Sequence, residues 1–238
     1  MWPYFGAKTE LVDLYPPPIH GTIIEPFAGT AIYSWKYWDR EIILYDKYKE
    51  IINIWEWLRS ASPADIIGLP RPAAGQKLKE LNFPCDAALK FMGFCCGYGY
   101  KHPAHIASPH LVKRPNFTNY RLEKIAANVH KIRNWKFFHA SYQSAPNIKA
   151  TWFVDPPYQR QGKGYKHGSG KIDYVELGKY CKSRYGQVIV CEGNPAQWLP
   201  FEHLKDETGC NGKKYQELLY YQVDQEAKRF VPLQGVLF

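Results

Sequence analysis

The chain has 238 residues, of which 45% are hydrophobic and 16% aromatic. This length and apolar content fit one domain, or one domain with a sizeable insertion, and exclude wholesale disorder. The 31 Lys and Arg residues outnumber the 22 Asp and Glu, and the formal net charge of +9 favours a polyanionic partner such as a nucleic acid. No apolar run has the length of a membrane span and the N-terminal residues contain no apolar leader, so no membrane partner is expected.

The cysteines and histidines give no sign of a metal site. The six cysteines form no C-x-x-C pair, and the adjacent Cys95 and Cys96 suit neither tetrahedral zinc nor an ordinary disulfide. His102, His105 and His110 lie close in sequence without supporting cysteine spacing, so no metal is expected. We expect reduced thiols in a cytoplasmic protein that is a monomer or weak dimer.

The first quarter of the chain predicts the beginning of a βαβ unit, because a strand, a glycine turn, a helix, a second strand, an acid and a second helix follow in order. The expected elements are one or two helical turns at 11–14, a strand at 22–25, a turn at 26–31, a helix at 32–38, a strand at 41–45 and a helix at 47–59.

Residues 60–118 differ from the rest, because they are rich in proline and include an irregular, aromatic and glycine-containing stretch at 93–102 after a helix at 86–94. We interpret them as an insertion into an α/β core formed by residues 1–59 and 119–238. The α/β pattern then resumes. The elements expected there are a helix at 120–135, a strand around 137–138, a strand ending at Asp155, a basic glycine loop at 159–171, a helix at 173–184, a buried strand at 187–192 and a late strand at 217–223.

The most informative stretch is Asp155-Pro156-Pro157-Tyr158, which directly follows the apolar residues Trp152 to Val154. The strand must stop at Asp155, because the two prolines lack backbone donors and have a fixed φ. In open α/β sheets ligands bind outside the carboxyl ends of strands. Asp155 and the Pro156 carbonyl can accept hydrogen bonds from an exocyclic amine, while Tyr158 can stack on its ring. The alternative interpretation is an ordinary strand ending in a proline-rich turn.

A second candidate feature lies at the ends of the first two predicted strands. Glu25 closes the first strand, Asp46 closes the second, and Gly29 lies in the turn between them. Gly29 lets the backbone approach a ligand closely, and an acid roughly 20 residues beyond a glycine turn grips ribose hydroxyls in nucleotide-binding units. The alternative is an ordinary strand–turn–helix junction with a solvated aspartate.

Several segments together resemble the ordered motifs of the Dam-type (D12 class) DNA adenine N6-methyltransferases, from residue 4 to about 222, although residues 60–118 match poorly. They are Tyr4-Phe-Gly-Ala-Lys8, Glu25-Pro-Phe-Ala-Gly-Thr-Ala31, Asp46, Asp155-Pro-Pro-Tyr158 and Lys214-Tyr-Gln-Glu217-Leu-Leu. The resemblance implies an α/β fold with a Rossmann-like S-adenosylmethionine-dependent methyltransferase sheet. Residues 1–59 and 119–238 are then the catalytic domain, and residues 60–118 are an inserted target-recognition region of a DNA-associated protein. It also implies methyl transfer from S-adenosylmethionine to the N6 amino group of adenine in DNA, with base flipping.

The resemblance also assigns roles to residues. S-adenosylmethionine is expected to bind Tyr4, Lys8, Glu25, Phe27, Gly29, Asp46 and Asp155. The target base is expected to bind the catalytic residues Asp155, Pro156, Pro157 and Tyr158, and replacing Tyr158 by Phe should keep much of the activity because the ring matters more than the hydroxyl. DNA phosphates are expected to contact Arg160, Lys163, Lys166, Lys171, Lys101, Lys113 and Arg114. For the lysines of the glycine loop, a solvated flexible loop is the alternative.

Three positions depart from the family pattern. Ala31 and Ala7 replace glycines, which is compatible with the motifs if φ is negative at both positions. Ser141 stands where the family often has an acid near the cofactor's adenine. Two other functions stay open: a methyltransferase of cytosine N4 or of RNA, since the same cleft accepts any planar exocyclic amine, and a nucleic-acid-binding protein with a decayed methyltransferase core.

Overall fold

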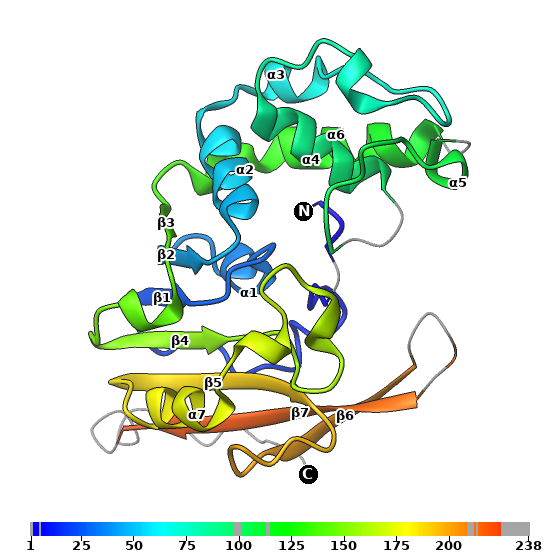
Figure 1. The fold of residues 1–238 in the computed structure, drawn as a ribbon. Helices are drawn as coiled ribbons and strands as arrows, with labels where there is room; N and C mark the ends of the chain where they lie inside the picture. The colour runs from blue at the N-terminus through cyan, green and yellow to red at the C-terminus, as the bar shows by residue number, and fades with distance from the viewer. Residues whose placement is uncertain are drawn as a thin grey trace.

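The computed structural model describes residues 2–4, 6–97, 101–112, 115–208, 212 and 214–224 (Figure 1). Within these ranges one sheet has the strand order β3-β2-β1-β4-β5-β7-β6. Its strands are β1 (Thr22–Glu25), β2 (Glu41–Asp46), β3 (Lys136–His139), β4 (Ala150–Val154), β5 (Gly186–Gly193), β6 (Glu202–Thr208) and β7 (Lys214–Val223). The helices are α1 (Ile32–Lys36), α2 (Lys49–Ser60), α3 (Pro63–Ile67), α4 (Asp86–Cys96), α5 (Pro109–Val112), α6 (Pro115–Asn128) and α7 (Tyr174–Lys182).

Strands β1 to β5 pair with one another in parallel, whereas β7 runs antiparallel to both β5 and β6. The prediction of a mainly parallel sheet with an antiparallel final strand is confirmed, and the α/β architecture is compatible with a Rossmann-like fold. The sequence did not predict β6, whose charged residues have low strand propensity. Pairing with β7 supplies its hydrogen bonds, and charged side chains are usual on an edge strand.

The direction of strand order reverses between β1 and β4. From β1 the sheet extends through β2 to β3 on one side, and from β4 it extends through β5 on the other. The carboxyl ends of β1 and β4 therefore border a crevice of the kind in which open α/β sheets bind ligands. Glu25, Asp46 and Asp155, which the sequence placed at strand ends, all lie at this edge of the sheet.

The two faces of the sheet pack against different helices, because successive side chains of a strand point in opposite directions. Ile23 and Phe153 belong to one hydrophobic core together with Trp55 of α2. Ile24 and Trp152 belong to a second core with Leu177 of α7. Helices thus cover both faces, as the sequence predicted (Figure 1).

The predicted insertion at residues 60–118 is largely helical and stacks above α2 in Figure 1. Phe91 of α4 and Leu78 join the same core as Trp55, so this region extends the core of one face. Helix α4 continues to Cys96. The prediction that the chain becomes irregular at Gly93 was therefore wrong for residues 93–96. Gly93 is needed inside the helix, since a Cβ there would lie 2.7 Å from the Ala104 carbonyl oxygen.

Other boundaries also differ from the predictions. Helix α6 begins at Pro115, inside the predicted insertion, and proline is well suited to the first turn of a helix. It gives way to a 3-10 turn at Val129–Ile132, whereas a single helix to residue 135 was predicted. Residues 11–14 form turns, not a helix, because the prolines that follow cannot continue one. Cys85, Cys95, Cys181 and Cys191 form no disulfide, and no helix in the described ranges is long and apolar enough to cross a membrane.

Candidate active site

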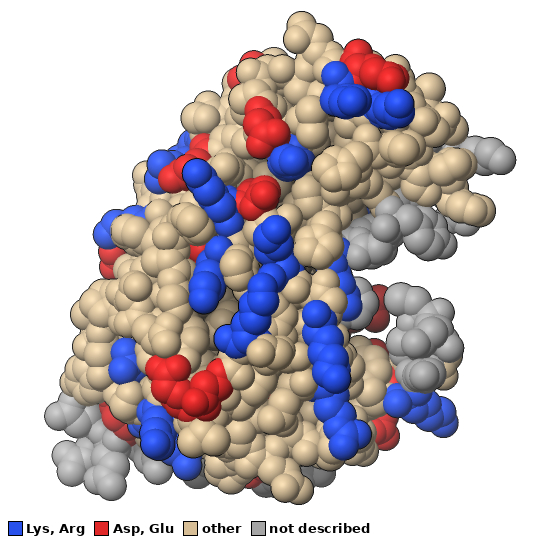
Figure 2. Space-filling model, viewed as in Figure 1, with Lys and Arg blue, Asp and Glu red and all other residues tan. Residues whose placement is uncertain are grey.

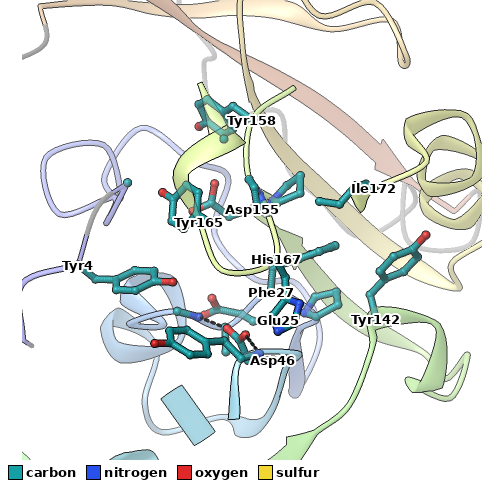
Figure 3. Close-up of a pocket in the computed structure, with 18 of the residues that line it drawn as sticks. Tyr4, Glu25, Phe27, Asp46, Tyr142, Asp155, Tyr158, Tyr165, His167 and Ile172 are labelled. Atoms are coloured by element: carbon teal, nitrogen blue, oxygen red, sulfur yellow. Dashed lines mark hydrogen bonds between the residues drawn. The ribbon is translucent and has the colours of Figure 1, made fainter. Parts of the chain in front are cut away.

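A cavity of about 880 Å³ opens at the carboxyl edge of β1, β2 and β4. Its walls bring together every residue that the sequence assigned to the cofactor or to the target base: Tyr4, Lys8, Glu25, Phe27, Gly29, Asp46, Asp155, Pro156, Pro157 and Tyr158. Figure 3 shows Tyr4 and Tyr142 on opposite sides of the cavity, with Asp155 between Tyr158 at one end and Asp46 at the other.

The turn after β1 and the end of β2 are joined through Asp46. The Gly29 N–H donates to one Asp46 oxygen at 3.0 Å, and the Tyr48 N–H donates to the other at 2.8 Å. Gly29 has a φ of +46°, and a Cβ there would lie 3.3 Å from the Tyr4 ring, so both the backbone conformation and the close packing favour glycine. Burial raises the pKa of Asp46 to about 6, although both N–H donors oppose the shift. Each carboxylate oxygen keeps a lone pair for a ligand hydroxyl.

The backbone of Ala31 does not have the negative φ that was expected from the sequence. Its φ is +45°, in the left-handed region, so the expectation of a negative φ was wrong at this position. An alanine in this conformation costs roughly 1–2 kcal/mol. Ala7 has no positive φ, and the expectation holds there.

Glu25 is buried and has a structural role in the fold. Its Oε1 accepts a hydrogen bond from the Ser34 N–H at 2.8 Å, in the first turn of α1. Burial raises its pKa to about 8, against the effect of that hydrogen bond. Glu25 therefore lines the cavity while capping a helix.

Lys8 lies at the centre of a buried charge cluster. Its Nζ is 2.9 Å from Asp155 Oδ1, 3.9 Å from Glu217 Oε1 and 4.6 Å from the centre of the Tyr158 ring. Burial opposes the charge on Lys8, but the Asp155 and Glu217 carboxylates outweigh it and raise the Lys8 pKa. Burial also raises the pKa of Asp155, and Lys8 opposes that shift.

The backbone after β4 is held from several directions. The Tyr174 hydroxyl donates to the Pro157 carbonyl, and the Gly162 N–H donates to the Tyr158 carbonyl at 2.7 Å. Glu192, at the end of β5, accepts the Gln159 N–H at 3.1 Å. Burial raises the Glu192 pKa to about 7. The Pro156 carbonyl, by contrast, accepts no hydrogen bond from the described part of the chain.

The glycine loop at 159–171 forms one wall of the cavity through Tyr165 and His167. The Tyr165 ring lies 6.0 Å from the Tyr4 ring, and Lys101 Nζ lies 5.4 Å from the centre of Tyr165. Two 3-10 turns, Gly162–Gly164 and Ser169–Lys171, shape the loop. This loop therefore connects the N-terminal segment to the predicted insertion beside the cavity.

The predicted DNA-binding residues surround this loop. Arg160, Lys163, Lys166 and Lys171 are exposed and Lys101 is half-buried, whereas Lys113 and Arg114 lie outside the described residues. Figure 2 shows Lys and Arg side chains gathered across the middle of the face that carries the loop. The structure thus places a basic surface next to the cavity.

Sequence reasoning missed several residues of the site. Tyr142 lines the cavity and stacks on Phe27 with ring centres 5.3 Å apart, next to the cavity-lining Ser141. Glu217 reaches the site from β7 and is only 1% exposed. Glu217 stands in the motif Lys214-Tyr-Gln-Glu217-Leu-Leu, but it was given no role from the sequence. Tyr165 and His167 lie in the glycine loop, in which only Arg160 and the lysines were given a role.

No protein-family model and no curated protein sequence matches this chain. In the ranges that the structure covers, no group of three or more His, Cys, Asp or Glu residues is arranged to hold a metal ion. The function is therefore argued from the cavity itself.

Proposed function

We propose that this protein transfers a methyl group from S-adenosylmethionine to the N6 amino group of adenine in DNA, on a Rossmann-like methyltransferase sheet. The supporting observation is that one cavity contains both halves of such a site. The Gly29 turn and Asp46 form the half suited to a nucleoside. Asp155, the Pro156 carbonyl and Tyr158 form the half suited to a planar amine.

The residues present fit S-adenosylmethionine by charge and by shape. Two carboxylates, the half-buried Asp155 and the buried Glu217, face the ammonium of Lys8, so the cluster has a negative excess. A ligand with a sulfonium and an ammonium group compensates this excess. Asp46 would hold the ribose hydroxyls, Gly29 would leave room for the ligand, and Lys8 would face its carboxylate. When bound, the cofactor supplies an electrophilic methyl group.

The chain's own residues would then activate and position the amine. An aryl amine is a poor nucleophile, because its lone pair is delocalised into the ring. Hydrogen bonds from its two N–H groups to Asp155 and the Pro156 carbonyl increase electron density on the nitrogen. Most of the rate enhancement would come from position and fixed charges. The base must leave the duplex to enter the cavity, and Tyr158 provides a ring on which it can stack.

The test is incubation with radiolabelled S-adenosylmethionine and duplex DNA, single-stranded DNA or RNA, followed by nucleoside analysis. We expect labelled N6-methyladenine from DNA. The control is Asp155→Asn, which keeps the size of the side chain and should lower transfer by at least roughly 100-fold, with duplex binding retained. Full transfer by this variant would reject the assignment of Asp155 to the reacting amine.

The same experiment separates the other candidate functions. N4-methylcytosine or methylated RNA as the product would identify the alternative amine substrates. No transfer, together with no S-adenosylmethionine binding by calorimetry, would identify a nucleic-acid-binding protein with a decayed core.

A further inference from the structure

Glu217 is a buried carboxylate that connects β7 to the candidate active site. Its Oε1 accepts a hydrogen bond from the Tyr15 hydroxyl at 2.9 Å and another from the Tyr158 hydroxyl. The same oxygen lies 3.9 Å from Lys8 Nζ. Because Glu217 is 1% exposed, water does not compete for these contacts.

The contact with Glu217 fixes the far end of the Tyr158 side chain. The near end is fixed by the backbone, since the Tyr158 carbonyl accepts the Gly162 N–H at 2.7 Å. Close packing adds to this, because a Cβ on Gly193 would lie 3.0 Å from the Tyr158 ring. A ring held at both ends keeps one tilt, which a stacking surface requires for a precise base position.

We propose that Glu217 is a positioning residue that acts through the Tyr158 hydroxyl, and that it holds the Tyr158 ring in the orientation on which the target base stacks. This inference rests on the proposed function. It gives the Tyr158 hydroxyl a larger role than the sequence-based expectation, in which the ring matters more than the hydroxyl. Hydrogen bonds to an ionised acceptor are roughly twice as strong as neutral ones, so removing this hydrogen bond frees the ring.

Tyr15 provides a matched control within the same cluster. Its hydroxyl donates to the same oxygen of Glu217, but Tyr15 does not line the cavity. Removing either hydroxyl takes one donor from the carboxylate. Only the removal of the Tyr158 hydroxyl should change the position of the base.

The experiment compares steady-state methyl transfer by Tyr158→Phe, Tyr15→Phe, Glu217→Leu and Glu217→Gln. At saturating S-adenosylmethionine, we expect kcat to fall on the order of 10-fold in Tyr158→Phe and Glu217→Leu, with the KM for DNA within about 3-fold of wild type. Glu217→Gln keeps an acceptor and should restore kcat to within about 3-fold, and Tyr15→Phe should lower it by less than about 2-fold. The double variant Tyr158→Phe/Glu217→Leu should be no slower than the slower single variant.

Equal kcat in Tyr158→Phe and Tyr15→Phe, or additive losses in the double variant, would overturn the proposal. If Glu217→Leu does not fold, the comparison of the two tyrosine variants and the rescue by Glu217→Gln still decide it.

A measurement without turnover separates this proposal from the proposed function. NMR of protein labelled with carbon-13 at tyrosine Cζ reports on the hydrogen bond of each hydroxyl. The Tyr158 resonance, assigned by its absence in Tyr158→Phe, should shift in Glu217→Gln, where the acceptor loses its charge. An unchanged resonance would reject the positioning role. If wild-type protein methylates no nucleic acid, the proposed function fails while the NMR result still reports whether Glu217 orients Tyr158.

Discussion

Single residues at the carboxyl edge of the sheet serve the fold and the site at once. Glu25 caps α1, and Asp46 accepts two backbone N–H groups, yet both line the cavity. Burial raises the pKa of Glu25 to about 8 and that of Asp46 to about 6. Because these carboxyl groups bind protons more tightly in the folded state than in the unfolded chain, they couple stability to pH.

The pH dependence can be tested at Glu25. Its pKa is raised from an ordinary 4.5, so its contribution to stability is complete below that value and is lost as pH rises through about 8. Glu25→Gln keeps an acceptor for the Ser34 N–H but does not titrate. The variant should therefore gain stability relative to wild type between about pH 5 and about pH 8. Urea unfolding of both proteins at the two pH values measures this. An identical pH dependence would contradict the prediction.

Ala31 allows a test of backbone strain. Ala31→Gly removes the unfavourable left-handed conformation of an alanine, which costs roughly 1–2 kcal/mol. The substitution also removes a buried methyl group and increases the conformational entropy of the unfolded state, and both effects destabilise the folded protein. We expect a change in the free energy of unfolding near zero. Ala28→Gly is the control, since Ala28 is equally buried without a positive φ and should lose roughly 1–2 kcal/mol. Equal losses in urea unfolding would show that Ala31 is unstrained.

Among the elements, the loop at 159–171 matters most for the site, because it packs directly on the residues after β4. A Cβ on Gly162 would lie 2.7 Å from the carbonyl carbon of Pro157, whereas a Cβ on Gly170 would meet nothing within 4 Å. The loop and the Asp155 turn therefore form one packed unit, and a change in one displaces the other.

This packing predicts different effects of two alanine substitutions in the loop. Gly162→Ala should move the Pro157 backbone and lower kcat for methyl transfer by on the order of 10-fold or more, since small displacements of positioned groups are costly. Gly170→Ala should stay within about 2-fold of wild type. Radiolabelled transfer assays, with thermal melting to confirm folding, measure both. Similar activity in the two variants would show that Gly162 does not position the turn.

At the scale of the whole molecule, a surface rich in Lys and Arg side chains lies next to the cavity. The net charge is +9, and exposed lysines of the loop at 159–171 gather on the face shown in Figure 2. Since nucleic-acid affinity depends on phosphate contacts, these lysines should contribute to affinity in a salt-dependent way. The proposed catalytic residues, which lie within the cavity, should contribute little to this affinity.

Salt dependence of DNA binding tests this arrangement. Replacing Lys163, Lys166 and Lys171 together by Gln should make the slope of the logarithm of the DNA-binding constant against log salt less negative by roughly 2–3. Each phosphate that is no longer neutralised changes this slope by about 0.9. The control triple replaces Lys136, Lys149 and Lys182, which are exposed at the amino edge of the sheet. This control should leave the slope nearly unchanged. Equal changes in the two triples would show that the loop lysines form no preferred DNA surface.

The sequence by itself determined the strands other than β6, the acids at the ends of β1 and β2, and the rigid turn at Asp155. These features follow from local chemistry: apolar runs favour buried strands, and two successive prolines end one. Because parallel strands end at the same edge of a sheet, the acids at these ends could be expected to meet there. The predicted cofactor and base-binding residues accordingly lie in one cavity.

Only the tertiary structure decided which partners these residues have. Tyr158 and Glu217 are 59 positions apart, and Tyr15 and Glu217 are 202 apart, so no local pattern could pair them. The edge strand β6 has weak strand propensity of its own and depends on pairing with β7. The left-handed Ala31 follows from the turn that the surrounding contacts impose. Local propensities thus place the acids, whereas long-range packing determines the hydrogen bonds and charges that surround them.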